Sequence, residues 1–351
     1  MSAETLPPLL KVRDLKVHFR VGGGGWKGNE IKVHAVDGIS FEVNRGRTMA
    51  IVGESGSGKT TTAFAVMRLL QPTAGSIVFN GVDITKMEGD DLRSQRRHLQ
   101  LVFQDPYSAL NPRQRAGDIV RTPLDVLGIG SPAQREEKVS ELFRLVGLRE
   151  DQRPLFPHQF SGGQRQRLNI ARALSTDPQL IVCDEPVSAL DIAIRAQILN
   201  LLRRIQLERG QSFLFISHDM AVVEHICDDI AVMYLGQIVE QATRVDFFTR
   251  PLHPYSVALM SAVPTVKGGR QKAANRIRLL GDPPSPINPP TGCRFAGRCP
   301  AAQPVCSQEP PALREIKPGH KVACHFVTVD GDRISAPLDG CQEKNLAEEM
   351  T

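Results

Sequence analysis

One stretch of this sequence has the composition of a phosphate-binding loop. Residues 53–60 fit the pattern G-x-x-x-x-G-K-S/T, between a short apolar run and a segment with helical spacing. Glycines let consecutive backbone N–H groups turn toward a phosphate, and the N-terminus of the following helix adds partial positive charge. Lys59 offers a charge for the β- and γ-phosphates, and the Thr60 hydroxyl offers a ligand to Mg²⁺. The predicted nucleotide-binding residues of this loop are Gly53, Glu54, Ser55, Gly56, Ser57, Gly58, Lys59, Thr60 and Thr61.

A pair of carboxylates farther along the chain suits the same site. Asp184 and Glu185 follow the apolar run 180–183, and α/β sheets bind ligands at the C-terminal ends of such strands. Asp184 can hold Mg²⁺ through water, and Glu185 can act as the general base that activates an attacking water. An acidic pair after a strand is by itself more often a helix cap. A phosphate loop in the same chain favours the catalytic interpretation, and Cys183 is expected to be a core residue.

The elements that must position these residues alternate along the chain. The strand-like runs are 10–19, 39–43, 49–52, 180–183 and 213–216, and a hairpin is expected at Asn80-Gly81. The segments with helical spacing are 60–70, 138–146, a helix that starts at 161, and 192–209. Gly147 and Gly210 are expected to end two of these helices. Residues 86–175 are expected to be mainly helical, and the alternation predicts an α/β fold with a parallel sheet.

Composition limits the other possibilities. The 351 residues are 41% hydrophobic and 23% charged, which indicates a folded chain of two or three domains. The net charge of +5 comes from cations and anions that are mixed along the chain, so no nucleic-acid partner is expected. No apolar run reaches the ~18 residues of a membrane span, and the N-terminus resembles no secretory signal. We therefore expect a cytoplasmic protein.

The order of the motifs resembles the ATP-binding subunits of ABC transporters over about residues 10–250. Besides the phosphate loop, the resemblance rests on Gln104, Phe160-Ser161-Gly162-Gly163-Gln164, Asp184-Glu185, Ser188-Ala189-Leu190-Asp191 and His218. It implies a P-loop NTPase of the ABC ATPase type, with a β-subdomain and a helical subdomain at about 105–175. ATP and Mg²⁺ are the implied ligands.

The same resemblance implies roles for individual residues. Glu185, His218 and Gln104 would be catalytic: His218 would contact the γ-phosphate, and Gln104 would sense Mg²⁺ and the attacking water. The metal ligands would be Thr60, Gln104 and Asp184. Without the resemblance, a histidine at a strand end is usually satisfied by local contacts.

A further motif implies that two subunits share the site. The implied signature residues are Ser161, Gly162, Gly163 and Gln164, which would cap the γ-phosphate of the nucleotide bound by the opposite subunit. A Ser-Gly-Gly start also gives a helix an anion-binding terminus. Asp191 would belong to the D-loop that links the two sites. Because the chain has one phosphate loop and one signature, the active form is expected to be a dimer of ATPase domains. The motifs leave open whether the second subunit is an identical copy or a paralogue, and we favour a paralogue.

The residue that stacks on adenine is less defined. The resemblance implies an aromatic side chain upstream of the phosphate loop, and Trp26 and Phe19 are the candidates. We favour Trp26, although a tryptophan in this glycine-rich segment is equally compatible with a surface that faces a partner.

The cysteines gather near the C-terminus. Cys293, Cys299, Cys306 and Cys324 match neither the usual C-x₂₋₄-C zinc pairs nor the ferredoxin runs. In a cytoplasmic chain their clustering favours a metal site, with disulfides or unconnected thiols as the alternatives. Cys341, in the polar tail 331–351, is expected to be a free thiol.

The region around these cysteines resembles the C-terminal extension of dipeptide/oligopeptide importer ATPases. The matching segments are 105–113, 186–191, 253–255, 279–286, 289–293 and 298–300. This resemblance spans about residues 9–326 and implies that the four thiolates hold a 4Fe–4S cluster, with Zn²⁺ as the alternative. The expected domains are an ATPase domain at 1–250 and a Cys/Pro-rich extension at 251–330.

The implied function is that of an energy-coupling ATPase of a bacterial importer for di- or oligopeptides or related small solutes. It would lie on the cytoplasmic face of the inner membrane as a peripheral subunit. Its partners would be a second ATPase subunit, two membrane permease subunits that meet residues 104–113, and an extracytoplasmic substrate-binding protein. The alternatives are a soluble ABC ATPase without a transporter and an iron–sulfur ATPase that senses redox state.

Overall fold

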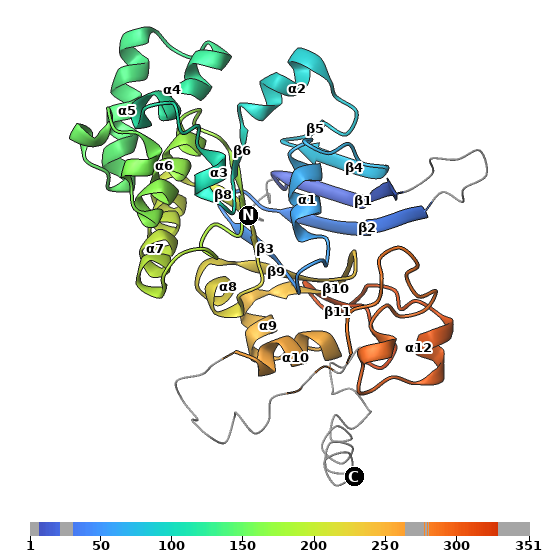
Figure 1. Ribbon diagram of the computed structural model, residues 1–351. Coiled ribbons are helices and arrows are strands. Elements are labelled where there is room, and N and C mark those ends of the chain that lie inside the picture. The colour runs from blue at the N-terminus through green and yellow to red at the C-terminus, as the bar shows by residue number, and fades with distance from the viewer. Residues whose placement is uncertain (1–6, 22–30, 264–276, 278, 280, 329–351) are drawn as a thin grey trace, which may run out of the picture.

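The centre of the fold is an eight-stranded sheet, most of it parallel (Figure 1). The computed structural model of the protein describes residues 7–21, 31–263, 277, 279 and 281–328. Across the sheet the strands are β11 (Arg314–Lys317), β12 (His320–Val322), β10 (Gln237–Thr243), β9 (Asp229–Tyr234), β3 (Thr48–Val52), β8 (Ser212–Ser217), β7 (Leu180–Asp184) and β6 (Leu99–Val102). The strands from β9 to β6 run parallel, and β10, β12 and β11 continue antiparallel. The strands β3, β7 and β8 are buried along their whole length, as expected when both faces of a sheet are covered.

A smaller antiparallel sheet holds the N-terminal strands. Its order is β2 (Ile31–Val43), β1 (Leu10–Val21), β4 (Ala74–Phe79) and β5 (Val82–Asp83). Asn80 and Gly81 both have positive φ, at +49° and +79°, which is the geometry of a type I′ turn and confirms the predicted hairpin. Helix α1 (Lys59–Val66) packs between the two sheets, because Val66 shares one core with Phe79 of β4 and Leu214 of β8.

Helices form a separate layer beside the parallel strands (green in Figure 1). They are α3 (Pro106–Ala109), α4 (Ala116–Leu127), α5 (Pro132–Val146), α6 (Gly162–Leu174) and α7 (Ile192–Arg209), with 3₁₀ turns at Glu150–Gln152 and Pro157–Gln159. Helix α2 (Gly89–Arg96) lies apart from them, above β5 in Figure 1. Helix α5 ends before Gly147 and α7 before Gly210, and both glycines adopt positive φ, so the predicted helix ends are confirmed. Phe143 and Leu168 lie in the core that joins α5 and α6 to α7.

One strand lies where mainly helical structure was expected. Strand β6, Leu99–Val102, pairs in parallel with β7 and forms one edge of the sheet. Its sequence, Leu-Gln-Leu-Val, is too short for its periodicity to separate a buried strand from a piece of helix. Residues 86–175 are mainly helical, as expected, but the expectation did not include this strand, which leads directly to Gln104.

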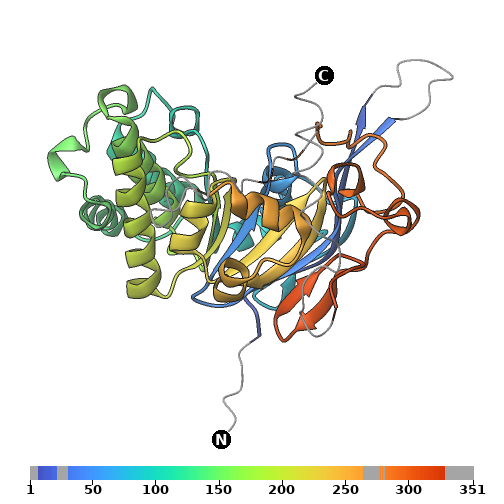
Figure 2. The ribbon, with the colours of Figure 1, turned by 90° about the horizontal axis from the view of Figure 1, so that it is seen from below.

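The region after residue 250 is joined to the ATPase sheet. Its helices are α10 (Pro254–Ser261) and α12 (Pro304–Gln308), with a 3₁₀ turn at Ala296–Arg298. Helices α8 (Met220–Ile226) and α9 (Arg244–Thr249) precede it. Strands β12 and β11 extend the main sheet beyond β10, and Figure 2 shows them at one margin of the molecule. Phe295 shares a core with Tyr234 of β9. The expectation of a separate small Cys/Pro-rich domain is not confirmed.

The helices of the described residues also bear on membrane insertion. None of them is both long enough and apolar enough to cross a bilayer.

Candidate functional site

The phosphate loop connects the buried strand β3 to the N-terminus of α1. Gly58 is the N-cap of α1 and has a φ of +104°. A Cβ atom at this position would lie 2.1 Å from the backbone oxygen of Ala35, so only glycine allows the close approach of β2 to the loop. The helix therefore begins at Lys59 with its free backbone N–H groups directed toward the loop.

Lys59 lies folded against its own loop. Its Nζ donates hydrogen bonds of 2.8 Å to the backbone oxygens of Gly53 and Glu54, and the residue is 5% exposed. Burial lowers the pKa of the Lys59 amine, and the nearby carboxylates of Glu185 and Asp184 oppose that shift. A buried ammonium group at the mouth of such a loop attracts polyanions strongly.

The first carboxylate of the acidic pair contacts the loop directly. The Thr60 hydroxyl donates a hydrogen bond of 3.0 Å to Oδ1 of Asp184 at the end of β7. Burial raises the pKa of Asp184, with a further contribution from Glu185, while the Thr60 hydroxyl and the Lys59 charge lower it. A carboxylate and a hydroxyl side by side are the hard oxygen ligands that Mg²⁺ prefers.

The second carboxylate is held from both sides. Gln104 Nε2 donates to Oε2 of Glu185 at 2.9 Å, and Nδ1 of His218 lies 2.9 Å from Oε1. Glu185 has a φ of +46°, a left-handed conformation that costs energy for a side chain with a Cβ. The three predicted catalytic residues come from different parts of the chain and meet at this strained position.

The loop and the catalytic residues line one cavity of about 690 Å³. Gln104, Glu185 and His218 face the loop residues 53–56 and 58–61 across it. The rest of its lining, which sequence reasoning missed, is Val33, Ala35, Leu259 and Pro286. Phe19 is paired with Val33 across β1 and β2, so the two side chains share a face of the small sheet. Trp26, the favoured adenine contact, lies outside the described residues.

The signature residues lie away from this cavity. Ser161 caps α6: its Oγ accepts a bond from the backbone N–H of Gln164, and Gln164 Oε1 accepts one from the backbone N–H of Ser161. This capping box is readable from the spacing of the two residues and was missed. Ser161 and Asp191 are exposed, and the side chain of Asp191 makes no capping hydrogen bond to α7.

The four predicted metal-ligating cysteines come together. Cys293, Cys299, Cys306 and Cys324 line a second, small cavity next to Phe295, and all four are free thiols. Burial raises the pKa of Cys299 to about 12 and raises those of Cys293 and Cys324, and backbone N–H groups that donate to these three sulfurs lower them. Burial outweighs these N–H···S bonds, so the thiols would give up their protons only on binding a metal. Cys183 is fully buried in β7, as predicted for a core residue.

Comparison with known proteins agrees with this geometry. A family model described as ABC transporter matches residues 36–188, and one described as oligopeptide/dipeptide transporter, C-terminal region, matches 239–306. The oligopeptide transport ATP-binding protein AppF of Bacillus subtilis is 45% identical over 93% of this chain and 99% of its own. The chain belongs to the oligopeptide/dipeptide family of ABC transporter ATP-binding proteins. The predicted resemblance is confirmed, and the protein is an ABC ATPase.

Other members and solved structures agree with that family. A putative peptide import ATP-binding protein of Brucella ovis is 47% identical over 91% of this chain and 98% of its own. The ATP-binding cassette MJ0796, solved as a dimer in a post-hydrolysis state with ADP and Pi, is 28% identical with a TM-score of 0.60 over 67% of this chain and 98% of its own. CbiO1 of Clostridium perfringens is 25% identical with a TM-score of 0.61, over 77% of this chain and 99% of its own. These structures confirm the mixed α/β ABC ATPase fold.

Proposed function

We propose that this ABC ATPase powers the import of di- or oligopeptides, or related small solutes, through a membrane permease. The observation that carries the proposal is the convergence of the phosphate loop, Gln104, Glu185 and His218 on one cavity. Relatives at 45% to 48% identity are named for peptide transport, which supports this substrate class. The same names do not favour a soluble ATPase without a transporter or a redox-sensing ATPase.

The loop and the polar side chains of the cavity have distinct parts in the proposed hydrolysis. The loop N–H groups and Lys59 bind the β- and γ-phosphates, and Thr60, Asp184 and Gln104 would hold Mg²⁺, which would neutralise phosphate charge. Glu185 takes the proton of the attacking water. Gln104 and His218 contact the two carboxylate oxygens of Glu185 and fix the orientation of that side chain.

The position of the signature motif supports a dimeric active form. Ser161 and the N-terminus of α6 do not line the nucleotide cavity of their own chain. In the proposed dimer, a second ATPase subunit places its signature against this cavity and receives this chain's signature in return. A paralogous subunit is our proposal for the second copy.

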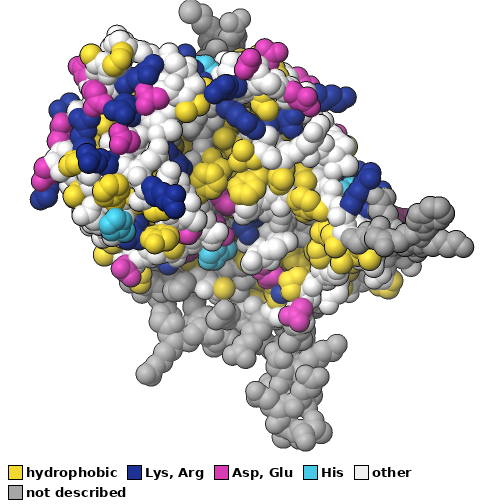
Figure 3. Space-filling model, turned by 45° about the horizontal axis from the view of Figure 1, so that its top comes forward, with side chains coloured by type: hydrophobic (Ala, Val, Ile, Leu, Met, Phe, Trp, Pro, Cys, Tyr) yellow, Lys and Arg dark blue, Asp and Glu magenta, His cyan; other side chains and the backbone are white. Residues whose placement is uncertain are grey.

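The surface also offers a contact for the permease. Tyr107, on α3, is 61% exposed, and the Arg165 guanidinium lies 5.1 Å from its ring centroid. On the face in Figure 3, hydrophobic side chains gather between areas that are richer in charged ones. We assign the segment 104–113 to contact with one of two permease subunits, which holds the protein on the cytoplasmic face of the inner membrane. An extracytoplasmic binding protein delivers the solute.

Purification tests this assembly. A tagged chain expressed with a candidate pair of hydrophobic permease subunits should retain both of them in mild detergent. Isolation without them, together with full ATPase activity in soluble form, would favour a non-transport ATPase.

The adenine contact can be assigned by mutation. Because Phe19 is 38% exposed and shares a face with Val33 of the cavity wall, we propose that it stacks on the base. Phe19→Ala should raise the ATP dissociation constant about tenfold, since stacking of a base is worth ~1–3 kcal/mol. Phe19→Tyr should keep the affinity. Weakening by Trp26→Ala but not by Phe19→Ala would assign the stacking to Trp26, the residue that the sequence favours.

The cysteine cavity supports a metal centre, which we propose is a 4Fe–4S cluster. The four free thiols line one small cavity, which supports a shared metal centre. A 4Fe–4S cluster would use all four thiolates, and a single Zn²⁺ held by four thiolates is the alternative. The centre would be structural and would tie Cys293, Cys299, Cys306 and Cys324 together.

Metal analysis tests the cysteine assignment. Cys299→Ser should lower the iron and sulfide content of anaerobically purified protein and lower its Tm by several degrees, because a ligand of the centre is lost. Cys341→Ser, outside the described residues, should change neither. Stoichiometric zinc without iron in the wild type would make Zn²⁺ the resident metal.

A further inference from the structure

Two residues from beyond position 250 contact the phosphate loop at Glu54. The backbone N–H of Glu54 donates a 2.8 Å hydrogen bond to the Tyr255 hydroxyl. The Arg298 guanidinium donates to both carboxylate oxygens of Glu54, at 2.8 and 3.3 Å. The second residue of the loop is therefore held by its main chain and by its side chain. Tyr255 and Arg298 lie in none of the nucleotide-site motifs, and the proposed hydrolysis does not use them.

The groups that hold Glu54 are themselves fixed. Tyr255 is fully buried, and its ring packs edge-on to Tyr234 at 4.8 Å and against Phe295 at 5.4 Å. The Arg298 side chain is 9% exposed and also donates to the Tyr234 hydroxyl at 3.3 Å. The Arg298 side chain is buried and the Glu54 side chain is 31% exposed, so this two-pronged contact is more directional and less screened than a fully exposed ion pair.

Arg298 is attached to the cysteine region, defined here as residues 293–324. It directly precedes Cys299, and Arg294 directly follows Cys293. Arg294 binds the backbone oxygen of Leu235 and pairs with Asp37 of β2. The cysteine region is thus joined to the ATPase fold by two arginines, and one of them ends on the phosphate loop.

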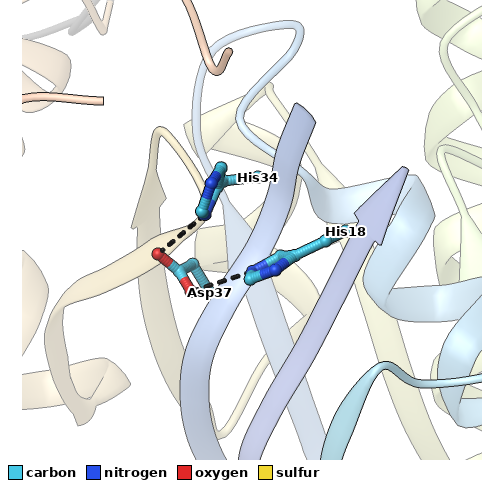
Figure 4. Close-up of side chains that lie close together, drawn as sticks. All are labelled: His18, His34 and Asp37. Carbon is cyan, nitrogen blue, oxygen red and sulfur yellow. Dashed lines mark hydrogen bonds and ion pairs between the residues drawn. The ribbon is translucent and has the colours of Figure 1, made fainter. Parts of the chain in front are cut away.

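The Asp37 anchor also includes two histidines. Figure 4 shows His18 and His34 on either side of Asp37, with His18 Nε2 at 3.0 Å and His34 Nδ1 at 3.5 Å from its oxygens. Such a group resembles a metal site, but Arg294 is already paired with the same carboxylate. A metal cation there would meet a neighbouring guanidinium charge, so the cluster serves as the anchor of Arg294.

The contact at Glu54 bears on the groups that would meet a nucleotide. Lys59 Nζ is bonded to the backbone oxygens of Gly53 and Glu54, so the peptide that Tyr255 holds also positions the Lys59 ammonium. A shift of Glu54 moves the start of the loop and its lysine together. Precise placement of loop N–H groups is what a phosphate-binding loop depends on.

We propose that Arg298 and Tyr255 are positioning residues for the phosphate loop, through which the cysteine region sets the affinity for ATP. The proposal rests on the proposed role of residues 53–60 in binding nucleotide. Because binding linkage is reciprocal, ATP must in turn stabilise the docking of the cysteine region.

Mutation of the contact tests the proposal with two readouts. In the full chain, Arg298→Gln and Tyr255→Phe should each raise the Kd and KM for Mg-ATP about tenfold with little change in kcat at saturation. Arg298→Lys should recover only part of the affinity, because an ammonium group cannot reproduce the two-pronged contact that the guanidinium makes with Glu54. Arg314→Gln is the matched control: Arg314 donates to the backbone oxygens of Cys324 and Val327 within or next to the cysteine region. It should keep the wild-type Kd.

Hydrogen exchange supplies the reciprocal readout. Mg-ATP should slow exchange of backbone amides in 293–306 in the wild type and not in Arg298→Gln. If both variants lower Tm but bind ATP like the wild type, the contact is only structural and the proposal is wrong. Tyr255→Phe removes one oxygen and keeps the packing, so it decides the matter if Arg298→Gln does not fold. Wild-type ATP affinity in Lys59→Met would instead overturn the proposed nucleotide site itself.

Discussion

Replacing Glu185 with Gln should lower kcat for ATP hydrolysis at least about a hundredfold while Mg-ATP still binds, because a positioned general base contributes about 10²–10⁴-fold. The amide keeps the size of the side chain and a carbonyl oxygen for Gln104, but it cannot take the proton of the attacking water. The contacts of Glu185 with Gln104 and His218 leave the side chain one orientation in the described site. Steady-state turnover and equilibrium ATP binding measure the two halves of this prediction.

The matched control for this variant is Glu137→Gln. Glu137 is exposed on α5, in the helical layer and away from the cavity. Its conversion removes the same charge and should leave turnover near the wild-type value. A Glu185→Gln protein that hydrolyses ATP within a few-fold of wild type would remove Glu185 from the role of general base.

Replacing Lys59 with Met should weaken Mg-ATP binding by about a hundredfold or more. The Met side chain keeps the apolar stem that packs in the loop, but it loses a buried charge that would face two phosphates. It also loses the hydrogen bonds to the oxygens of Gly53 and Glu54. Calorimetric titration with Mg-ATP measures the change, and a thermal melt shows whether the fold is retained.

Lys86→Met is the control for charge alone. Lys86 is an exposed residue near the small sheet and does not line the nucleotide cavity. Its loss should leave the ATP dissociation constant unchanged. Binding by Lys59→Met at wild-type strength, in a folded protein, would show that residues 53–60 are not the phosphate site.

Local patterns in the sequence predicted the parts of the site that depend on neighbouring residues. The phosphate loop is a short motif, and its glycines follow from backbone geometry, as the close approach of Gly58 to Ala35 shows. The C-terminal ends of α5 and α7 were predictable because glycine is the residue that most easily takes the left-handed conformation there. The strand β6 was not, because four apolar-rich residues carry too little periodicity.

Contacts between distant segments could not be predicted in this way. Tyr255 and Arg298 are 201 and 244 residues from Glu54 in the chain, and neither lies in a pattern that names its partner. The pairing of Phe19 with Val33 depends on the register of β1 and β2. That pairing contains several register shifts, which the sequence pattern does not define. The acidic pair after a strand indicated Glu185, and the resemblance supplied Gln104 and His218. The convergence of these three residues requires the full sheet topology.

Uptake of a labelled peptide by cells tests the central claim most directly. Cells that lack this chain should lose ATP-dependent uptake of the importer's peptide, regain it with the wild-type chain, and fail to regain it with Glu185→Gln at equal expression. Restoration by Glu137→Gln would show that the loss follows from hydrolysis and not from charge. Full uptake with Glu185→Gln, or no change when the chain is absent, would contradict the conclusion that its ATP hydrolysis powers peptide import.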